Sequence, residues 1–488
     1  MIGRCKMNFN YVVFSVLKNY YLYDGVSSNI LSISKELYDN HHIIFKNIEN
    51  GTYESDKKFY KEYQEIFEAV NEGLLKESTD TNLKFWFESD NFTSDFSDEI
   101  SHLMIGVTEK CNLRCKYCVF GGHYPNERVH STENIDMQTL KNSLNVFFRI
   151  SKSKNKIINF YGGEPLVNFD AIKYATEFVK SVDDSAMIFA TTNGTLLNKS
   201  VCEWFIKNNN IHFYVSMAGL PQMHDKLRVT PNGGDTFNLI KSNLLYLKTM
   251  DKNAYANRIH FIFNIFSEYQ LLELDEYWNT NELFEDMNTQ PEISFIDCEN
   301  DDGYVSDIGK KISEFYQKEY DFNLLDKYFE LLNAKKYSHL LVRHFDEEFL
   351  SVHRRPNSDE NLITGVCKPF VKKIFVNTRG DINLCENFMC NDFWGNVNSN
   401  IEINKVNAFL EKYKMARQKT CKQCWASKMC SLCFRDLFDN DSSINMNRAA
   451  HLCENERKYI KSMLEDYCYI MEKDNTILDH LNDYIITL

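Results

Sequence analysis

HLMIGVTEKCNLRCKYC, residues 102–118, joins a run of strand-forming residues directly to three closely spaced cysteines. Its first seven residues are mostly apolar, which is typical of a buried strand. Cys111, Cys115 and Cys118 follow with C-x3-C-x2-C spacing. In parallel sheets the functional residues lie in the loops after the carboxyl ends of the strands. The stretch therefore predicts a site directly after a strand.

Five further strand-like runs follow, and amphipathic helical runs separate them. The strand-like runs are IINFYGG (157–163), AMIFATTNG (186–194), IHFYVSMAG (211–219), RIHFIFNI (258–265) and EISFID (292–297). Between them, segments such as 137–150 and 169–182 place apolar residues at helical spacing. Strands that alternate with helices indicate right-handed βαβ units. We expect an α/β fold with a parallel sheet over residues 99–300.

The two ends of the chain depart from this pattern. Residues 1–98 contain two strand-like runs, 11–16 and 20–25, and two helical runs, 30–42 and 56–75, which predict a small α+β unit. Residues 301–365 have the polar helical character of a bridging region. Residues 366–488 concentrate the remaining cysteines, contain a hairpin at 372–388 and end in one or two helices.

The composition narrows the possible partners and the compartment. The 488 residues are 43% hydrophobic and 25% charged, as in a globular protein, and the net charge of -14 argues against nucleic acid or an anionic membrane as partner. No signal peptide or membrane-length apolar run is present. Fifteen cysteines in such a chain point to metal ligation before disulfides, and a cytoplasmic location is expected.

The cysteine loop lacks one ligand of a closed metal site. A structural zinc ion takes four ligands, and no further Cys or His follows with finger or ribbon spacing. Three thiolates fit a four-iron cluster with one open iron. In the GGEP segment, Gly162 and Gly163 permit close backbone approach, and Glu164 offers an acceptor for an ammonium group. Such a segment is also a common turn, but its place after a predicted strand favours a site.

These motifs resemble the radical S-adenosylmethionine superfamily. The resemblance covers the three cysteines, the aromatic Tyr117 before the last of them, and Gly162, Gly163, Glu164 and Pro165. It implies a partial (βα)6 barrel related to the TIM barrel. It also implies a 4Fe-4S cluster whose open iron binds S-adenosylmethionine and cleaves it to a 5'-deoxyadenosyl radical. A reducing electron donor of the flavodoxin or ferredoxin type would be a partner.

Two further loops are similar to cofactor contacts of this family. Thr192 and Asn193 lie at a predicted strand end, and Ser216 and Arg228 match the pattern S-x-D-G-P...HD..R of peptide-modifying members. The chain departs from that pattern at Ala218, where the family has Asp, and at Leu220, where it has Pro. The alternative for Ser216 and Arg228 is a strand-end serine and a solvated arginine.

The C-terminal cysteines resemble a SPASM domain, which carries two auxiliary 4Fe-4S clusters. By that resemblance one cluster would be held by Cys421, Cys424, Cys430 and Cys453, and the other by Cys367, Cys385 and Cys433. The second set is one ligand short, so either Cys390 or a substrate sulfur completes it. A structural zinc ribbon remains the alternative for the C-x2-C pairs.

The resemblance also suggests a substrate. The N-terminal unit looks like a leader-recognition module, which binds the leader of a precursor peptide as an added strand or in an adjoining groove; a dimerising or capping appendage is the alternative. The leading hypothesis is a ribosomal-peptide maturase that installs a thioether. Glu386 stands where sulfatase-maturing relatives have an aspartate base, although a cluster-rim glutamate is an equal interpretation. The competing functions are an anaerobic sulfatase maturase and a non-catalytic zinc scaffold.

Overall fold

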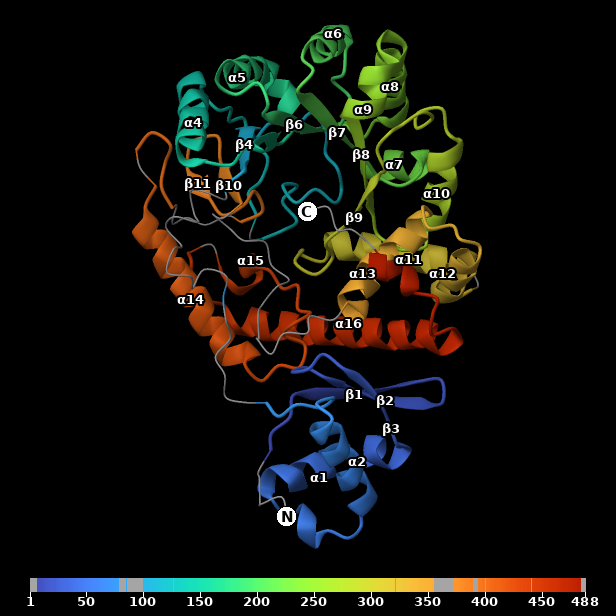
Figure 1. Ribbon diagram of the computed structural model, residues 1–488. Helices are drawn as coiled ribbons and strands as arrows, with labels where there is room; N and C mark the ends of the chain where they lie inside the picture. Colours follow the sequence, from blue (N-terminus) through green and yellow to red (C-terminus); the bar gives the residue numbers. More distant parts are fainter. Residues whose placement is uncertain are drawn as a thin grey trace.

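The protein has three stacked parts. Its structure is a computed structural model that describes residues 7–78, 85, 100–125, 127–320, 322–354, 372–388, 394–399, 401–439 and 441–483. The large sheet and its helices lie at one end, the C-terminal helices in the middle and the N-terminal unit at the other end (Figure 1). The expected boundaries at residues 98 and 365 fall outside the described residues.

The large sheet contains all six strands that the sequence predicts. They are β4 (His102–Thr108), β5 (Ile157–Gly162), β6 (Met187–Thr192), β7 (Ile211–Met217), β8 (Ile259–Ile265) and β9 (Glu292–Phe295). They pair in chain order, and all are parallel. Their carboxyl ends therefore meet at one edge, where the cysteine loop begins.

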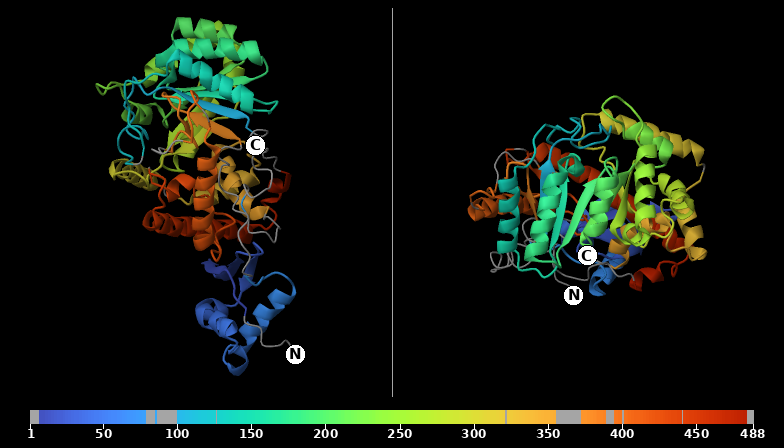
Figure 2. Two further views of the ribbon diagram at one scale, coloured as in Figure 1. Left: turned by 90° about the vertical axis from the view of Figure 1, so that its left-hand side faces the viewer. Right: turned by 90° about the horizontal axis from the view of Figure 1, so that it is seen from above.

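Helices cover the outer face of this sheet, as Figure 2 shows from above. They are α4 (Met137–Ile150), α5 (Phe169–Val182), α6 (Lys199–Lys207), α8 (Phe237–Met250), α9 (Lys252–Arg258) and α10 (Gln270–Thr280). The short helix α7 (Pro221–Leu227) lies instead beside the cysteine loop, where Leu227 O accepts from the Lys116 amide. Burial alternates along β7: Phe213 and Val215 are fully buried, whereas their neighbours His212, Tyr214 and Ser216 are only partly buried. This alternation leaves the second face of the strand for a site.

A C-terminal hairpin extends the sheet at the β4 side. β10 (Lys373–Val376) and β11 (Ile382–Asn383) form the hairpin that the sequence predicts. β10 also pairs in parallel with β4, which gives the order β11-β10-β4-β5-β6-β7-β8-β9. This pairing was not expected. It joins β11, which ends two residues before Cys385, to the same sheet as the strand that leads to the cysteine loop.

Two helical groups lie below the sheet. The predicted bridging region contains α11 (Tyr304–Glu319), α12 (Leu324–Asn333) and α13 (Leu340–His353). The C-terminal part contains α14 (Ile403–Cys421), α15 (Phe434–Leu437) and α16 (Met446–Lys473). α13 packs against both α10 and α16 and so joins the core to the C-terminal part. Within the described residues, none of the helices has the length and apolar character needed to cross a membrane.

The N-terminal unit has one strand more than the sequence suggests. β1 (Tyr11–Val16), β2 (Asn19–Asp24) and β3 (Ile30–Ile33) form an antiparallel sheet, with α1 (Lys35–Asn50) and α2 (Tyr60–Asn71) beside it. The run 30–42, interpreted as one helix, is divided by Ser34, whose hydroxyl caps α1 by accepting from the Leu37 amide. β1 packs against α16.

Candidate active site

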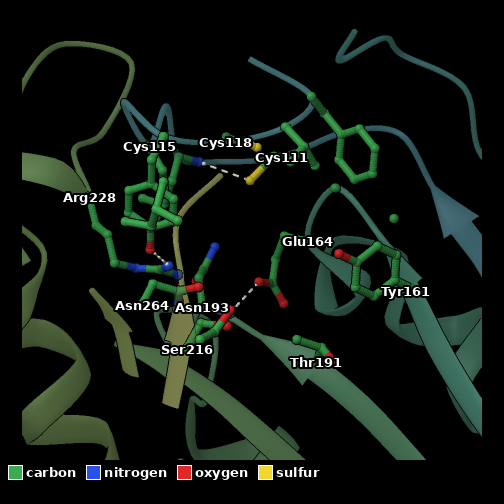
Figure 3. Close-up of a pocket in the computed structure, with 18 of the residues that line it drawn as sticks. Cys111, Cys115, Cys118, Tyr161, Glu164, Thr191, Asn193, Ser216, Arg228 and Asn264 are labelled. Atoms are coloured by element: carbon green, nitrogen blue, oxygen red, sulfur yellow. Dashed lines mark hydrogen bonds between the residues drawn. The ribbon is translucent and has the colours of Figure 1, made fainter. Parts of the chain in front are cut away.

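A cavity of about 370 Å³ lies at the carboxyl ends of the strands. The cysteine loop and the ends of β5 to β9 line most of it, as Figure 3 shows. Two residues from the C-terminal part, Asn387 and Arg435, also line it. The structure thus brings together at one cavity the three core cysteines and the residues Tyr117, Gly162, Gly163, Glu164, Thr192, Asn193, Ser216 and Arg228.

The three core cysteines face the cavity as free, partly buried thiols. Burial raises the pKa of Cys111 to about 11 and that of Cys118 to about 12. At these two residues the neutral thiol is therefore favoured until a metal binds the thiolate. His130 lies beside them, with Nε2 3.6 Å from the Cys118 sulfur.

Gly162 and Gly163 serve a contact within the protein. A Cβ on Gly162 would lie 2.1 Å from the Thr108 carbonyl oxygen, and one on Gly163 would lie 2.1 Å from that of Lys110. Gly162 also has a φ of 131°, which glycine adopts without strain. The Gly163 amide donates to Thr108 O and the Glu164 amide donates to Lys110 O, each at 2.8 Å. The glycines therefore let the end of β5 pack directly on the start of the cysteine loop.

Glu164 connects two loops of the site. Its carboxylate accepts from the Thr192 hydroxyl at 2.7 Å, from the Asn193 amide at 2.6 Å and from the Leu166 amide at 3.1 Å. The side chain is almost fully buried, and burial raises its pKa. Pro165 follows it as the first residue of a short 3-10 helix, η2 (Pro165–Asn168). Glu164 thus fixes the loop after β6 against the loop after β5.

Asn193 carries this connection on to the cysteine loop. Its side-chain amide donates to Asn112 Oδ1 at 2.9 Å, and the amide of Asn112 donates to the Thr195 hydroxyl at 2.8 Å. Sequence reasoning missed Asn112 and Thr195. Their positions, directly after Cys111 and in the ATTNGT segment, were the only local signals available.

Arg228 is a buried cation at the edge of the cavity. Its Nη1 donates to the Tyr117 hydroxyl at 2.6 Å. Figure 3 shows a dashed hydrogen bond at the labelled Arg228. Its Nε is buried and has no hydrogen-bond partner among the described residues. An unsatisfied buried donor is costly, so this nitrogen fits an anionic ligand in the cavity. The solvated-arginine interpretation does not match its 5% exposure.

The HD pair of the Arg228 segment has a structural role. His224 Nδ1 accepts from the Ala218 amide at 3.4 Å, and its Nε2 lies 3.2 Å from the Thr236 hydroxyl. That hydroxyl donates to the Arg228 carbonyl oxygen at 2.7 Å. Burial lowers the pKa of His224 to about 2, so the ring stays neutral. The residues around Arg228 are therefore held in one conformation.

Polar residues from neighbouring strands complete the cavity wall. Ser216 at the end of β7 lines it, and so do Thr191 of β6 and Asn264 of β8, which the sequence analysis did not single out (Figure 3). The Asn264 amide donates to the Met217 carbonyl oxygen at 3.0 Å and so ties β8 to β7.

The C-terminal part closes the cavity through an ion pair. Arg435 Nη2 lies 3.1 Å from Asp297 Oδ2, just beyond β9, and both residues line the cavity. Glu386 lies nearby but is paired with Lys373 Nζ at 2.8 Å, and its neighbour Asn387 is the residue that lines the cavity. A role of Glu386 as a base stays a prediction.

The C-terminal cysteines surround a second buried arginine. Arg417 has no exposed surface; its Nη2 lies 3.8 Å from the Cys430 sulfur, and its charge also acts on Cys421 and Cys453. Its Nε and Nη1 have no hydrogen-bond partner among the described residues. Cys453 in turn interacts electrostatically with Cys421 and Cys424. Cys385 and Cys433 are described, whereas Cys367 and Cys390 lie outside the described residues.

The spacing of the sulfurs bears on the choice between zinc and iron. A zinc ion at about 2.3 Å from each sulfur holds its ligands about 4 Å apart. Among the described residues, no three cysteine sulfurs lie within 4.8 Å of one another, in either cysteine group. The wider spacing and the unsatisfied Arg417 donors fit clusters of several irons with bridging sulfides, which offer acceptors over a larger volume.

Comparison with known proteins agrees with this geometry. Residues 105–265 match the Radical SAM superfamily, so this part of the chain is a radical SAM domain. A cysteine-type anaerobic sulfatase-maturating enzyme of Clostridium novyi is 30% identical over 152 residues, which are 30% of this chain and 40% of that protein. The radical SAM cyclopropyl synthase TigE of Paramaledivibacter caminithermalis is 25% identical over 266 residues, 47% of this chain and 54% of that protein.

A solved structure extends the similarity of fold to most of the chain. Native anSMEcpe with bound AdoMet and the Kp18Cys peptide superposes with a TM-score of 0.54 at 17% identity, covering 78% of this chain and 99% of that one. By contrast, the chain aligns with only about half, or less, of the length of the two curated relatives above.

Proposed function

We propose that the protein is a radical S-adenosylmethionine maturase that installs a thioether crosslink in a ribosomally made precursor peptide. The observation that carries this proposal is the cavity at the strand ends. Three free thiols, the Gly-Gly-Glu loop and a buried arginine with an unpartnered nitrogen all line one space of about 370 Å³.

The residues present fit the cofactors of such an enzyme. Cys111, Cys115 and Cys118 would hold three irons of a 4Fe-4S cluster and leave the fourth for S-adenosylmethionine. Arg228 has its unpartnered Nε available for the cofactor carboxylate. The C-terminal cysteines, with Arg417 among them, would hold two auxiliary clusters.

The bound cofactors would supply a 5'-deoxyadenosyl radical, which removes a hydrogen atom from an unactivated carbon. The chain itself binds and orients the substrate and excludes water from the cavity. Glu164 and Asn193 lock the loops after β5 and β6 to the cysteine loop. The apolar wall of the cavity is formed by Tyr161, Phe295 and Ile296. The ion pair between Arg435 and Asp297 closes the side of the cavity that faces the C-terminal part.

The position of the N-terminal unit supports a peptide substrate with a leader. A Cβ on Gly25 would lie 2.5 Å from the Trp425 carbonyl oxygen, so the turn after β2 packs on the residue next to Cys424. Tyr21 donates to Glu472 of α16 at 2.8 Å. Because β1 packs on α16, β3 is the edge that we assign to an added leader strand.

The thioether reaction balances with one auxiliary acceptor. The substrate carbon loses a hydrogen atom, the cysteine sulfur loses a proton and one S–C bond forms. One electron is left over, and an auxiliary cluster held by the C-terminal cysteines would accept it. The close contact between Gly25 and Trp425 joins the N-terminal unit directly to that part of the protein.

Anaerobic reconstitution followed by two measurements tests this proposal. The reduced protein with S-adenosylmethionine should release 5'-deoxyadenosine. A precursor peptide with its leader should lose two hydrogens and one free thiol, as read by mass spectrometry and thiol labelling, whereas the leaderless core peptide should bind at least about tenfold more weakly. Zinc without sulfide, and no 5'-deoxyadenosine, would instead identify a non-catalytic scaffold.

The same mass spectrum separates the competing reactions. Formylglycine formation, the reaction expected of a sulfatase maturase, replaces a thiol by an aldehyde. A carbon–carbon ring closure removes two hydrogens but leaves every thiol free to be labelled. The long N-terminal unit and the absence of an acid at Ala218, which is fully buried in an apolar cluster with Tyr117 and Leu227, weigh against the sulfatase reaction.

A further inference from the structure

A second group of metal-binding side chains lies outside the cavity. Glu268 follows β8, and His344 and Glu348 lie on α13. One ligand atom from each residue lies within 4.8 Å of the others, and within the described residues this is the only such group of His, Cys, Asp and Glu. His344 Nε2 is 3.4 Å from Glu268 Oε1 and 3.9 Å from Glu348 Oε1.

The geometry suits one small ion. His344 and Glu348 are four residues apart, so they share one face of the helix. Ligands about 2.1 Å from a divalent ion lie about 3 to 4 Å from one another, which matches the two distances. His344 Nε2 is buried and has no hydrogen-bond partner among the described residues, although both carboxylates lie beside it.

The charges around the group are not balanced by protein cations. A surface cavity of about 500 Å³ is lined by Glu268 and Glu348, and also by Asp466 and Tyr459 of α16. None of the three carboxylates forms an ion pair with a described lysine or arginine, and the ion pairs of Glu268 and Glu348 are with His344. Tyr459 donates to Glu348 Oε1 at 2.6 Å, as a residue that orients a metal ligand does.

We propose that Glu268, His344 and Glu348 bind one divalent transition-metal ion, with the Asp466 carboxylate facing the same site. One imidazole nitrogen with several carboxylate oxygens suits Mn²⁺, Fe²⁺ or Zn²⁺ and contrasts with the all-sulfur sets elsewhere in the chain. The site goes beyond the proposed function and does not depend on it.

The ion would join three parts of the molecule. It would tie the loop after β8 to α13 and, through Asp466 and Tyr459, to α16. The His344 ring also contacts Phe295 of β9, with centroids 5.1 Å apart, and Phe295 lines the active-site cavity. The metal would therefore hold one wall of that cavity and the C-terminal part in a fixed relation.

A proton is the competing occupant. Burial disfavours the charged ring, but Glu268 and Glu348 outweigh it and raise the pKa of His344. A protonated His344 would then pair with the two glutamates without any metal. The metal-bound and proton-bound states differ in one measurable property. Only in the metal-bound state does the stability of the protein depend on the metal concentration.

Binding of Mn²⁺ to the oxidised, reconstituted full-length protein tests the proposal. The free Mn²⁺ signal in electron paramagnetic resonance should fall with a stoichiometry of one ion per chain, and added MnCl2 should raise the unfolding temperature. Glu348→Gln and His344→Gln should each weaken binding by at least about tenfold. Glu347→Gln removes the same charge from an exposed neighbouring position of α13, from which only its charge reaches His344, and should weaken binding far less.

Wild-type protein alone can overturn the proposal. If it binds no stoichiometric Mn²⁺ and its unfolding temperature does not respond to MnCl2 or ZnCl2, the group is an ion pair between protonated His344 and the two glutamates, without a metal. Equal weakening by Glu347→Gln would show diffuse attraction to an acidic surface and would also overturn it. Release of 5'-deoxyadenosine reports on the cysteine cavity, so failure of either proposal can be recognised separately.

Discussion

The core cysteine loop and the C-terminal cysteine region each contain a buried arginine, but the two arginines face different surroundings. Arg228 lines a cavity of about 370 Å³ and gives one nitrogen to Tyr117 while its Nε stays unpartnered. Arg417 is completely buried among cysteines, with two unpartnered nitrogens. An unpartnered donor beside open space fits a ligand that comes and goes. An unpartnered donor with no exposed surface, beside cysteines, fits a group that stays.

Of the changes that test this comparison, removal of the core thiols should have the largest effect on activity. The triple variant Cys111→Ala, Cys115→Ala and Cys118→Ala should release no 5'-deoxyadenosine but keep the iron and sulfide of the C-terminal region. The physical reason is that the two regions share no described ligand. Iron analysis and chromatography of reaction mixtures check this. Cys202→Ala is the control, because it removes a buried thiol that donates a hydrogen bond to Leu197 O outside both regions. Loss of all iron in the triple variant would contradict the separation of the two regions.

Arg417→Met should act only on the C-terminal region. The variant removes a buried positive charge beside Cys421 and Cys430, so it should destabilise the more negative, reduced cluster and lower its reduction potential. A redox titration followed by electron paramagnetic resonance measures the shift. Lys419→Met changes an exposed charge on the same helix, α14, and should have no effect. An equal shift in both variants would remove Arg417 from this role.

Arg228→Met should act only on the core cavity. Loss of a charged donor to the cofactor should weaken S-adenosylmethionine binding by about tenfold or more, while all clusters remain. Equilibrium dialysis of the reconstituted protein gives the dissociation constant. Tyr117→Phe keeps the guanidinium and removes only its partner, so it should have a smaller effect. If affinity is unchanged in Arg228→Met, the unpartnered Nε does not face the cofactor.

As pH falls, the core region should lose its iron more readily than the C-terminal region. Burial raises the pKa of both Cys118 and Cys430. At Cys118 the neighbouring cysteines raise it further, whereas at Cys430 the Arg417 guanidinium, 3.8 Å from the sulfur, is the main opposing charge. A thiol with a raised pKa must release a proton to bind iron, so cluster assembly is favoured by high pH and lost as pH falls. Iron retained after incubation from pH 9 down to pH 6, in wild type and the triple variant, measures this smallest effect. A steeper loss from the C-terminal region would reverse the order.

Local patterns predicted the parts of the fold that depend on neighbouring residues. The alternation of strands and helices gave all six parallel strands, and the hairpin at 372–388 was confirmed as β10 and β11. The run 30–42 was interpreted as one helix, although ILSI forms β3, because four apolar or small residues fit either period. Membership of the hairpin in the main sheet could not be predicted, since Lys373 pairs with His102 across more than half of the chain.

Candidate site residues were predicted better than their contacts. Gly162, Gly163 and Glu164 line the cavity as expected. Their close contacts, however, are with Thr108, Lys110, Thr192 and Asn193 rather than with open space. Asn387 and Arg435 were missed because nothing in the local sequence says that the C-terminal part reaches the strand ends.

The sequence by itself determined the βα alternation, the cysteine spacing and the radical SAM motifs, because each depends on residues a few positions apart. Only the tertiary structure decided how far apart the donor atoms lie in space. That spacing separates the dispersed sulfurs of the cysteine groups from the compact set of Glu268, His344 and Glu348. The loop after β8 and helix α13, which packs against α10 and α16, bring the compact set together, and such long-range packing leaves no local pattern in the chain.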